Sequence, residues 1–208
     1  MPSLEALIPA AVVLILSLSF HEAAHAWTAD RLGDPTARML GRLTLNPLAH
    51  IDWIGTVLFP LLAMYSGLPI IGWAKPVPVN MRNLRHPRRD FAIVALAGPV
   101  SNLIIAVTVA AFLMLLPGEP PVLLNRMTPA TILTLAVVVN VLLAVFNMIP
   151  VPPLDGGNVL AGLVPEEFAR VIDQLRPYGF LVLYALMFSG VLTAIVRPVQ
   201  NFILNVLL

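Results

Sequence analysis

Residues 4–29 read LEALIPAAVVLILSLSFHEAAHAWTA, an apolar run that ends in two histidines and one glutamate. The run is apolar up to Phe20 and is long enough, as a helix, to cross a hydrocarbon core about 30 Å thick. Ionisable groups in such a span are costly, at about 2.5 kcal/mol or more each near the bilayer centre, and they usually serve a function. The stretch therefore predicts a membrane span whose inner end carries functional polar side chains.

The rest of the chain has the same apolar character, since 59% of its 208 residues are hydrophobic and only 11% are charged. Further full spans are predicted at Phe91–Leu116, Ala130–Ile149 and Tyr178–Val196. No stretch is left over for a sizeable soluble domain, so we expect residues 1–208 to form a single membrane-embedded domain. The predicted fold class is an all-α polytopic membrane protein with about four full spans.

Two apolar segments do not fit a straight span. The run Ile51–Ile71 is interrupted by two glycines and two prolines, which predicts a re-entrant segment that returns on the side it entered. The basic stretch 72–90 contains an alternating KPVPVN sequence at residues 75–80, which indicates a loop or an edge strand of a possible short β hairpin. The tail Pro198–Leu208 is too short to cross and is expected to be an interfacial segment.

Charge and cysteine content exclude several classes of protein. The formal net charge of +1 gives no broad basic face, so no binding to nucleic acid is expected. The chain has no cysteine, which excludes disulfides, thiolate zinc sites and cysteine nucleophiles. Any metal site must therefore be built from histidine and carboxylate ligands.

The sequence His21-Glu22-Ala23-Ala24-His25 is an HExxH pattern. On a helix with about 3.6 residues per turn, His21 and His25 share one face and can ligate one Zn²⁺. Zinc with three protein ligands keeps a position for water, and Glu22 beside the first histidine can act as the general base. The competing interpretation is that these polar residues, with Trp27, only anchor a helix end at the membrane interface.

Two histidines do not complete a protein zinc site. Asp155, in the sequence Leu154-Asp155-Gly156-Gly157, is the other polar, metal-competent residue at the end of an apolar span, and it is the best candidate for the third ligand. Aspartate followed by glycine would equally suit a turn or the start of a helix. Prolines at positions 150 and 153 break the preceding helix, which favours a wet or protein-lined pocket at this point.

With these motifs in place, the chain resembles the site-2 protease family of intramembrane zinc metalloproteases. The likeness is carried by HExxH at residues 21–25, by Gly98-Pro99-Val100-Ser101-Asn102, similar to a GxxxN motif, and by residues 147–156, similar to an NxxPxxxLDG motif. The resemblance implies one zinc per chain, Asp155 as a zinc ligand, and transmembrane proteins as substrates within the lipid bilayer. It also implies that the stretch between the first span and the GxxxN span helps to hold substrate in an extended form. The chain leaves no room for the PDZ or CBS domains of some relatives.

Three further polar residues are candidates for substrate binding. Asn102 and Asn147 lie in apolar spans, where an amide can hydrogen-bond an unwound substrate backbone or bridge two helices. His50 can stabilise a developing oxyanion, or it can be a loop histidine at the interface. The alternatives to a protease are a membrane metal-ion transporter, which would need a second polar path through the membrane, and an inactive scaffold that binds membrane segments. An intact Glu22 argues against the scaffold.

The orientation in the membrane follows from the positions of the proposed ligands. The histidines and Asp155 can share a metal only if their two spans run parallel, with one crossing between them. Loops 30–50, 72–90 and 151–177 then lie on one side and hold ten of the twelve Lys and Arg residues. By the positive-inside rule that side is cytoplasmic, which places the N-terminus outside and the site nearer the cytoplasm of a prokaryotic plasma (inner) membrane.

Overall fold

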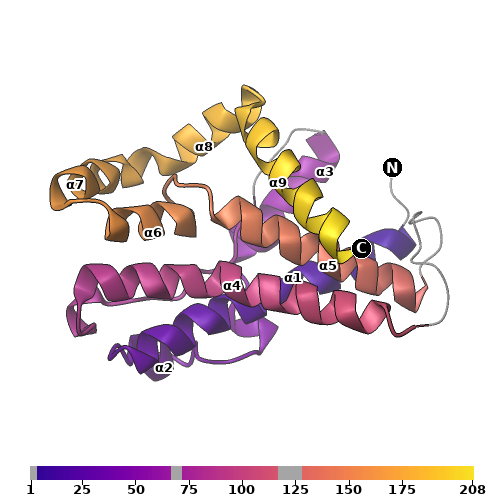
Figure 1. The fold of residues 1–208 in the computed structure, drawn as a ribbon, viewed down its shortest axis with the longest axis horizontal. Coiled ribbons are helices and arrows are strands. Elements are labelled where there is room, and N and C mark those ends of the chain that lie inside the picture. Colours follow the sequence, from indigo (N-terminus) through magenta and orange to yellow (C-terminus); the bar gives the residue numbers. More distant parts are fainter. Residues whose placement is uncertain (1–3, 67–71, 117–127) are drawn as a thin grey trace.

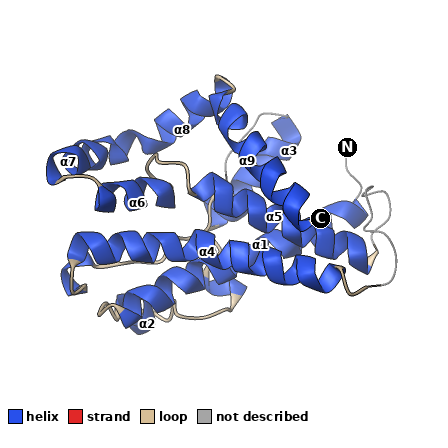
Figure 2. Ribbon diagram, viewed as in Figure 1, coloured by secondary structure: helices blue, strands red, loops and turns tan. Residues whose placement is uncertain are grey.

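The structure, a computed structural model, describes residues 4–66, 72–116 and 128–208. Every regular element in these ranges is helical, and Figure 2 shows helices and loops with no strand among the described residues. The elements in chain order are α1 (Leu4–Arg31), α2 (Thr36–Met39), a 3-10 turn (Pro47–Ala49), a π-helical segment (Trp53–Leu58), α3 (Phe59–Ser66), a second 3-10 turn (Met81–Asn83), α4 (Pro87–Leu113), α5 (Pro129–Asn147), α6 (Asp155–Leu163), α7 (Glu166–Leu175), a third 3-10 turn (Arg176–Tyr178), α8 (Gly179–Phe188) and α9 (Val191–Leu207). The all-α prediction is confirmed.

Three helices form the centre of the molecule. Helix α4 packs against α1, α5 and α6, and α1 also contacts α5. In Figure 1, α1 and α5 run in the same direction and α4 runs in the opposite direction. These are also the described helices that are long and apolar enough to cross a membrane, over Leu7–Arg31, Pro87–Leu113 and Pro129–Asn147. Each matches a predicted span.

Local sequence signals fix where two of these helices begin. Proline occupies the first position of both α4 and α5, where its missing N–H costs nothing. Asp90, in the first turn of α4, accepts a hydrogen bond from the backbone N–H of His86. The Thr128 hydroxyl accepts one from the N–H of Thr131 at the start of α5. Both helix starts are thus encoded within five residues.

The predicted fourth span, Tyr178–Val196, is not one helix. Helix α8 ends at Phe188, Gly190 adopts a left-handed conformation with φ 78°, and α9 begins at Val191 after a bend of 77°. Average hydropathy does not predict this break. The break depends on a glycine, because glycine can adopt positive φ and so end a helix. The predicted interfacial tail Pro198–Leu208 is likewise not separate, because it continues α9. Helix α9 crosses α5 and packs on it (Figure 1).

The possible β hairpin is also absent from the described residues. Residues 72–80, called the extended segment below, have no regular secondary structure, and their backbone pairs with single groups from several places instead of with a second strand. The N–H of Lys75 donates to the carbonyl of His50, and the N–H of Asn80 donates to Asp34. Pro76 and Pro78 lack the N–H groups that a strand ladder needs.

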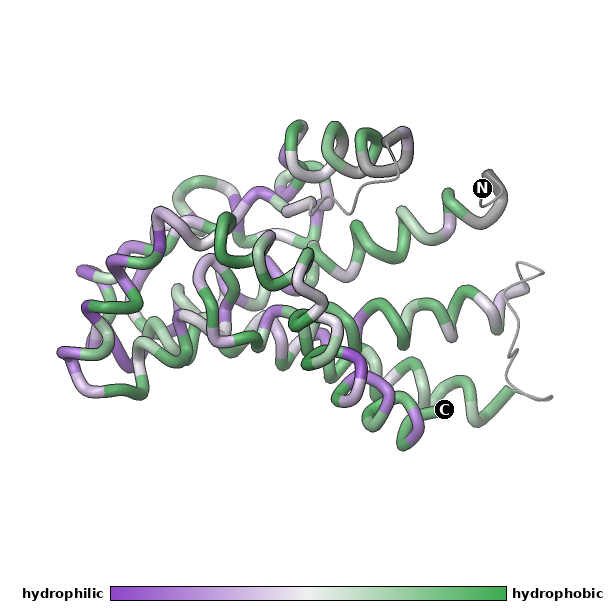
Figure 3. Tube along the Cα trace, turned by 90° about the horizontal axis from the view of Figure 1, so that it is seen from above, coloured by the Kyte–Doolittle hydropathy of each residue, from purple (hydrophilic) through white to green (hydrophobic). Residues whose placement is uncertain are grey.

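Polar and apolar residues separate along the long axis of the molecule. Figure 3 shows hydrophilic residues gathered at the end where α2, α7 and the start of α4 lie, while the end with the N-terminus is mainly hydrophobic. Both ends of the segment between α1 and α4 lie at the hydrophilic end, because the N–H of Arg85 donates to the carbonyl of Leu32.

Candidate metal centre

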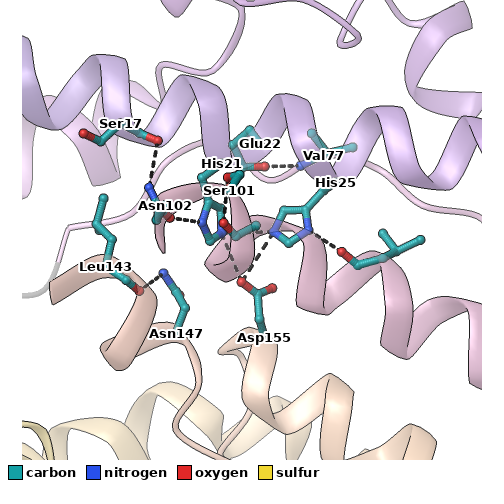
Figure 4. Close-up of polar contacts among 12 residues, drawn as sticks. Ser17, His21, Glu22, His25, Val77, Ser101, Asn102, Leu143, Asn147 and Asp155 are labelled. Carbon is teal, nitrogen blue, oxygen red and sulfur yellow. Dashed lines mark hydrogen bonds and ion pairs between the residues drawn. The ribbon is translucent and has the colours of Figure 1, made fainter. Parts of the chain in front are cut away.

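The two histidines of the HExxH pattern lie one turn apart on α1, on the face that packs against α4. Their side chains are buried, and their Nε2 atoms are 3.0 Å apart. The rings meet edge to face, with centroids 4.6 Å apart. Figure 4 shows both rings turned toward the start of α6.

Asp155, the first residue of α6, completes the group. Its Oδ2 atom lies 3.0 Å from His21 Nε2 and 3.4 Å from His25 Nε2. Ligand atoms about 2.1 Å from a tetrahedral zinc are themselves roughly 3.4 Å apart, so the three atoms have the mutual spacing of zinc ligands. Asp155 Oδ2 is buried without a hydrogen-bond partner, as expected for an atom reserved for a metal. Among the described residues, these three side chains make up the group that can hold a metal ion.

Gly98 on α4 keeps the space between the ligands open. A Cβ atom at this position would lie 2.5 Å from Nε2 of both His21 and His25. No real side chain fits there, so the first residue of the GxxxN-like motif is glycine for a steric reason. The three ligand atoms and the space that Gly98 leaves between them therefore fit a zinc ion.

The second ring nitrogen of each histidine faces an oxygen that can only accept a hydrogen bond. His25 Nδ1 lies 2.7 Å from the backbone carbonyl of Val94, and His21 Nδ1 lies 2.6 Å from Oδ1 of Asn102. Each Nδ1 must therefore carry the proton, which leaves the Nε2 lone pairs facing the metal position. Helix α4 thus supplies both the clearance and the outer partners of the ligands.

Glu22 lies beside the ligands and contacts the extended segment. Its Oε2 atom accepts a hydrogen bond of 2.9 Å from the backbone N–H of Val77, and the side chain is largely buried. Figure 4 shows this contact on the side of His21 away from Asp155. The carboxylate is therefore held in place by the chain that lies across the site.

A cavity of about 480 Å³ borders this group. Its polar lining comprises the three candidate ligands, Glu22, Asn147 and Asn158, and its walls are otherwise mainly apolar side chains and the extended segment. Trp73 and Phe180 line it where that segment meets α8, with ring centroids 5.3 Å apart. The cavity is therefore a largely apolar chamber with its polar groups concentrated at one place.

The three weaker candidates have different locations. Asn147 lines the cavity and donates from Nδ2 to the carbonyl of Leu143. Asn102 is fully buried between helices, where it contacts His21 instead of lining the cavity. His50 is buried, with Nε2 2.9 Å from the carbonyl of Thr44, and lines a small separate cavity instead.

Sequence reasoning missed the residues that hold the extended segment. Arg42 is buried and donates from Nη2 to the carbonyl of Lys75, at 2.6 Å. Asp34 is fully buried and accepts hydrogen bonds from Asn80, Asn83 and Thr36. Burial raises the pKa of Asp34, but the hydrogen bonds from Thr36, Asn83 and Asn80 outweigh this effect and lower the pKa below its usual value. Both Arg42 and Asp34 are charged residues in loops. Charged side chains in loops are usually solvated, so the sequence did not indicate that these two are buried.

Comparison with known proteins assigns the chain to a family. The profile of peptidase family M50 matches residues 122–190. A protein of Bacillus subtilis named as a zinc metalloprotease, YwhC, is 37% identical over 192 residues, which cover 91% of this chain and 84% of the relative. The protein named as zinc metalloprotease Rip2 of Mycolicibacterium smegmatis is 31% identical over 86% of this chain and 66% of its own length. No solved structure gives a significant match. This chain belongs to peptidase family M50, the site-2 protease family, whose metal is zinc.

Proposed function

We propose that this protein is an intramembrane zinc metalloendopeptidase that hydrolyses peptide bonds within or next to the transmembrane segments of other proteins. The observation that carries the proposal is the convergence of His21, His25 and Asp155 beside Glu22, at a cavity whose walls are mainly apolar. The names of the bacterial relatives support the same chemistry. One zinc per chain is expected.

In this proposal each residue of the site has a separate role. His21, His25 and Asp155 would hold the metal. Zinc, when bound, supplies a Lewis acid that lowers the pKa of water and polarises a peptide carbonyl. The Glu22 carboxylate takes the proton from the attacking water and delivers it to the leaving amine. The Val77 N–H holds Oε2 of Glu22, so Oε1 is the atom assigned to proton transfer.

The substrate would be a membrane-spanning helix that unwinds locally in the cavity. Helical backbone is closed to a nucleophile by its own hydrogen bonds, so groups that bind extended backbone are needed. The Asn147 amide, which lines the cavity, and the extended segment 72–80 are suitably placed for this role. Asn102 is better suited to holding His21, and His50 to holding the loop that it shares with Thr44.

We also propose that the apolar run Ile51–Ile71, between α1 and α4, is re-entrant. The N–H of Trp73 donates to the carbonyl of Gly55, and the Thr56 hydroxyl donates to the carbonyl of Trp73, so the first part of the run lies against the chain just after it. Helices α1 and α4 can both span while this segment leaves and returns at the same face. With the positive-inside rule, this orientation puts the N-terminus outside and the site nearer the cytoplasm of the bacterial inner membrane.

A metal transporter is less well supported. Transport would need further metal-binding side chains along a path, whereas the described residues contain a single such group. A base beside the ligands is required for hydrolysis but not for passage of an ion.

The proposed function can be tested with purified protein and a panel of single-span membrane proteins. We expect cleavage that a zinc chelator abolishes and added zinc restores. Glu22→Gln should keep about one zinc per chain and lose at least about a thousandfold in cleavage rate, because it removes the base and spares the ligands. Asp155→Ala should lose both metal and activity. Chelator-resistant cleavage, or appreciable activity of Glu22→Gln, would contradict the proposal.

A further inference from the structure

A buried chain of polar side chains connects the candidate metal ligand His21 to helix α5. Asn102 donates from Nδ2 to Oδ1 of Asn140, at 2.7 Å, and to the carbonyl of Ser17, at 3.3 Å. Asn140 donates from Nδ2 to the hydroxyl of Ser17, at 2.9 Å, and to the carbonyl of Ala136, at 2.8 Å. Asn102 is 0% exposed and Asn140 is 1% exposed, and neither lines the substrate cavity.

Two backbone carbonyls determine which way both amides face. A carbonyl oxygen can only accept, so the atom of Asn140 that faces the carbonyl of Ala136 must be the NH₂ group. Its Oδ1 then faces Asn102. The carbonyl of Ser17 imposes the NH₂ group on the facing atom of Asn102 in the same way. Turning either amide over would set oxygen against oxygen in a buried place, where an unsatisfied polar group costs about 1–3 kcal/mol.

This orientation has a consequence for the metal ligand. With both NH₂ groups fixed, the remaining atom of Asn102 is the oxygen that lies 2.6 Å from His21 Nδ1. Only the Nδ1–H tautomer of His21 can donate to it, and only this tautomer leaves Nε2 free to ligate. His25 needs no such arrangement, because its Nδ1 faces the backbone carbonyl of Val94 directly.

We propose that Asn140 and Ser17 are positioning residues that act through Asn102 to hold His21 in its metal-binding tautomer and ring orientation. Three helices, α1, α4 and α5, contribute one residue each to this relay of Ser17, Asn102 and Asn140. The packing of these helices is therefore coupled to the tautomer and ring orientation of His21. The inference rests on the proposed function, because it takes His21 to be a ligand. Outer partners of this kind typically change metal affinity by about ten- to a hundredfold when removed.

The experiment measures zinc affinity by chelator competition in the full-length protein carrying Glu22→Gln, so that the readout does not depend on activity. We expect Asn140→Leu to weaken zinc binding about tenfold, Asn102→Leu by at least as much, and Ser17→Ala by less, since Asn140 then keeps the carbonyl of Ala136. Val137→Ala is the matched control. It removes buried volume one turn away on α5, in the cluster with Ala106, Ala110 and Val141, and should leave zinc affinity unchanged.

A second readout follows the tautomer itself. The chain has four histidines, so ¹⁵N-histidine NMR of the zinc-free protein, at a pH where the imidazoles are neutral, can isolate His21 by its loss in His21→Gln. We expect Nδ1–H in the wild type and a mixture of tautomers in Asn140→Leu. If Asn140→Leu does not fold, Ser17→Ala decides by the same two measurements.

Failure of the proposed function and failure of the relay give different results. A wild-type protein that does not bind zinc contradicts the proposed function. A wild type that binds zinc, with affinity unchanged in the relay variants or lowered equally by Val137→Ala, overturns the relay alone.

Discussion

At the scale of single residues, the site requires the small size of a glycine as well as the polar side chains around it. Gly98 leaves the space in which the Nε2 atoms of His21 and His25 converge. Asn102, four residues later and one turn along α4, receives the other nitrogen of His21. The GxxxN-like motif therefore combines clearance and orientation on one face of one helix.

Gly98→Ala should nearly abolish zinc binding while the protein still folds as helices. The added methyl group would lie 2.5 Å from both Nε2 atoms and occupy the ligand space. We expect zinc content below about a tenth of the wild-type value, since the metal cannot approach both histidines. Metal analysis and circular dichroism of the purified variant give the answer. As a control, Gly190→Ala adds a methyl group with no atom within 4 Å and should keep its zinc, although positive φ makes it less stable. Normal zinc content in Gly98→Ala would show that the metal lies elsewhere.

At the scale of elements, the extended segment 72–80 is a strap across the site, and side chains hold it at both ends. Arg42 binds the carbonyl of Lys75, and Asp34 binds the N–H of Asn80. Between these points, Val77 donates to Glu22. The position of Glu22, the proposed base, is thereby linked to the loops that follow α1.

Asp34 should contribute stability that depends on pH. Its pKa in the folded protein is lowered, so its contribution is fully present above the pKa of an unfolded aspartate, about 3.9, and is lost as the pH falls through the lower folded value. Asp34→Asn should lower the unfolding temperature in detergent at pH 7, by an amount corresponding to about 1–3 kcal/mol, because its NH₂ group would face the Asn80 N–H or the Asn83 amide. The difference from wild type should shrink as the pH falls below about 4.

The control for this measurement is Glu166→Gln. The pKa of Glu166 is also lowered, through its hydrogen bond with Arg170, but that ion pair is exposed on α7. Exposed pairs contribute little to stability, so this variant should unfold near the wild-type temperature at every pH. A gap between Asp34→Asn and wild type that stays constant down to pH 3 would rule out the buried carboxylate as its cause.

At the scale of the whole molecule, the parallel course of α1 and α5 is what allows a single metal site. His25 lies near the end of α1 and Asp155 lies just beyond the end of α5, and α4 runs in the opposite direction to both helices (Figure 1). A full crossing by the segment between α1 and α4 would separate the two halves of the site by roughly the 30 Å of the hydrocarbon core.

The topology can be tested because the chain has no cysteine of its own. We expect single cysteines replacing Arg38 and Arg85 to be labelled by an impermeant thiol reagent only after cells are opened. A cysteine at Arg126, which lies outside the described residues, should be labelled in intact cells, because the proposed topology puts the connection between α4 and α5 on the opposite side of the membrane. Arg38 on α2 is chosen because its side chain is exposed, whereas the neighbouring loop residue Arg42 is buried. Labelling of positions 38 and 85 from opposite sides would contradict the re-entrant segment.

The sequence by itself determined the features that depend on neighbouring residues. The length of an apolar run predicts a span because bilayer thickness and helical rise are fixed, and α1, α4 and α5 match such runs. The spacing of His21 and His25 predicts a shared face because one helical turn separates them. The same reasoning did not reveal the break within residues 178–196, where a glycine that takes positive φ separates α8 from α9.

Only the tertiary structure decided which distant groups meet. The sequence offered Asp155 as a metal ligand or as a helix start, and it occupies both places, as the first residue of α6 and beside the histidines. It offered Asn102 as a contact for substrate or between helices, and the packing of α1, α4 and α5 brought it to His21. Spacing within one helix is set by covalent geometry. The approach of remote segments is set by how their surfaces pack, as where Gly98 lets α4 lie against the histidines, and no local pattern specifies that packing.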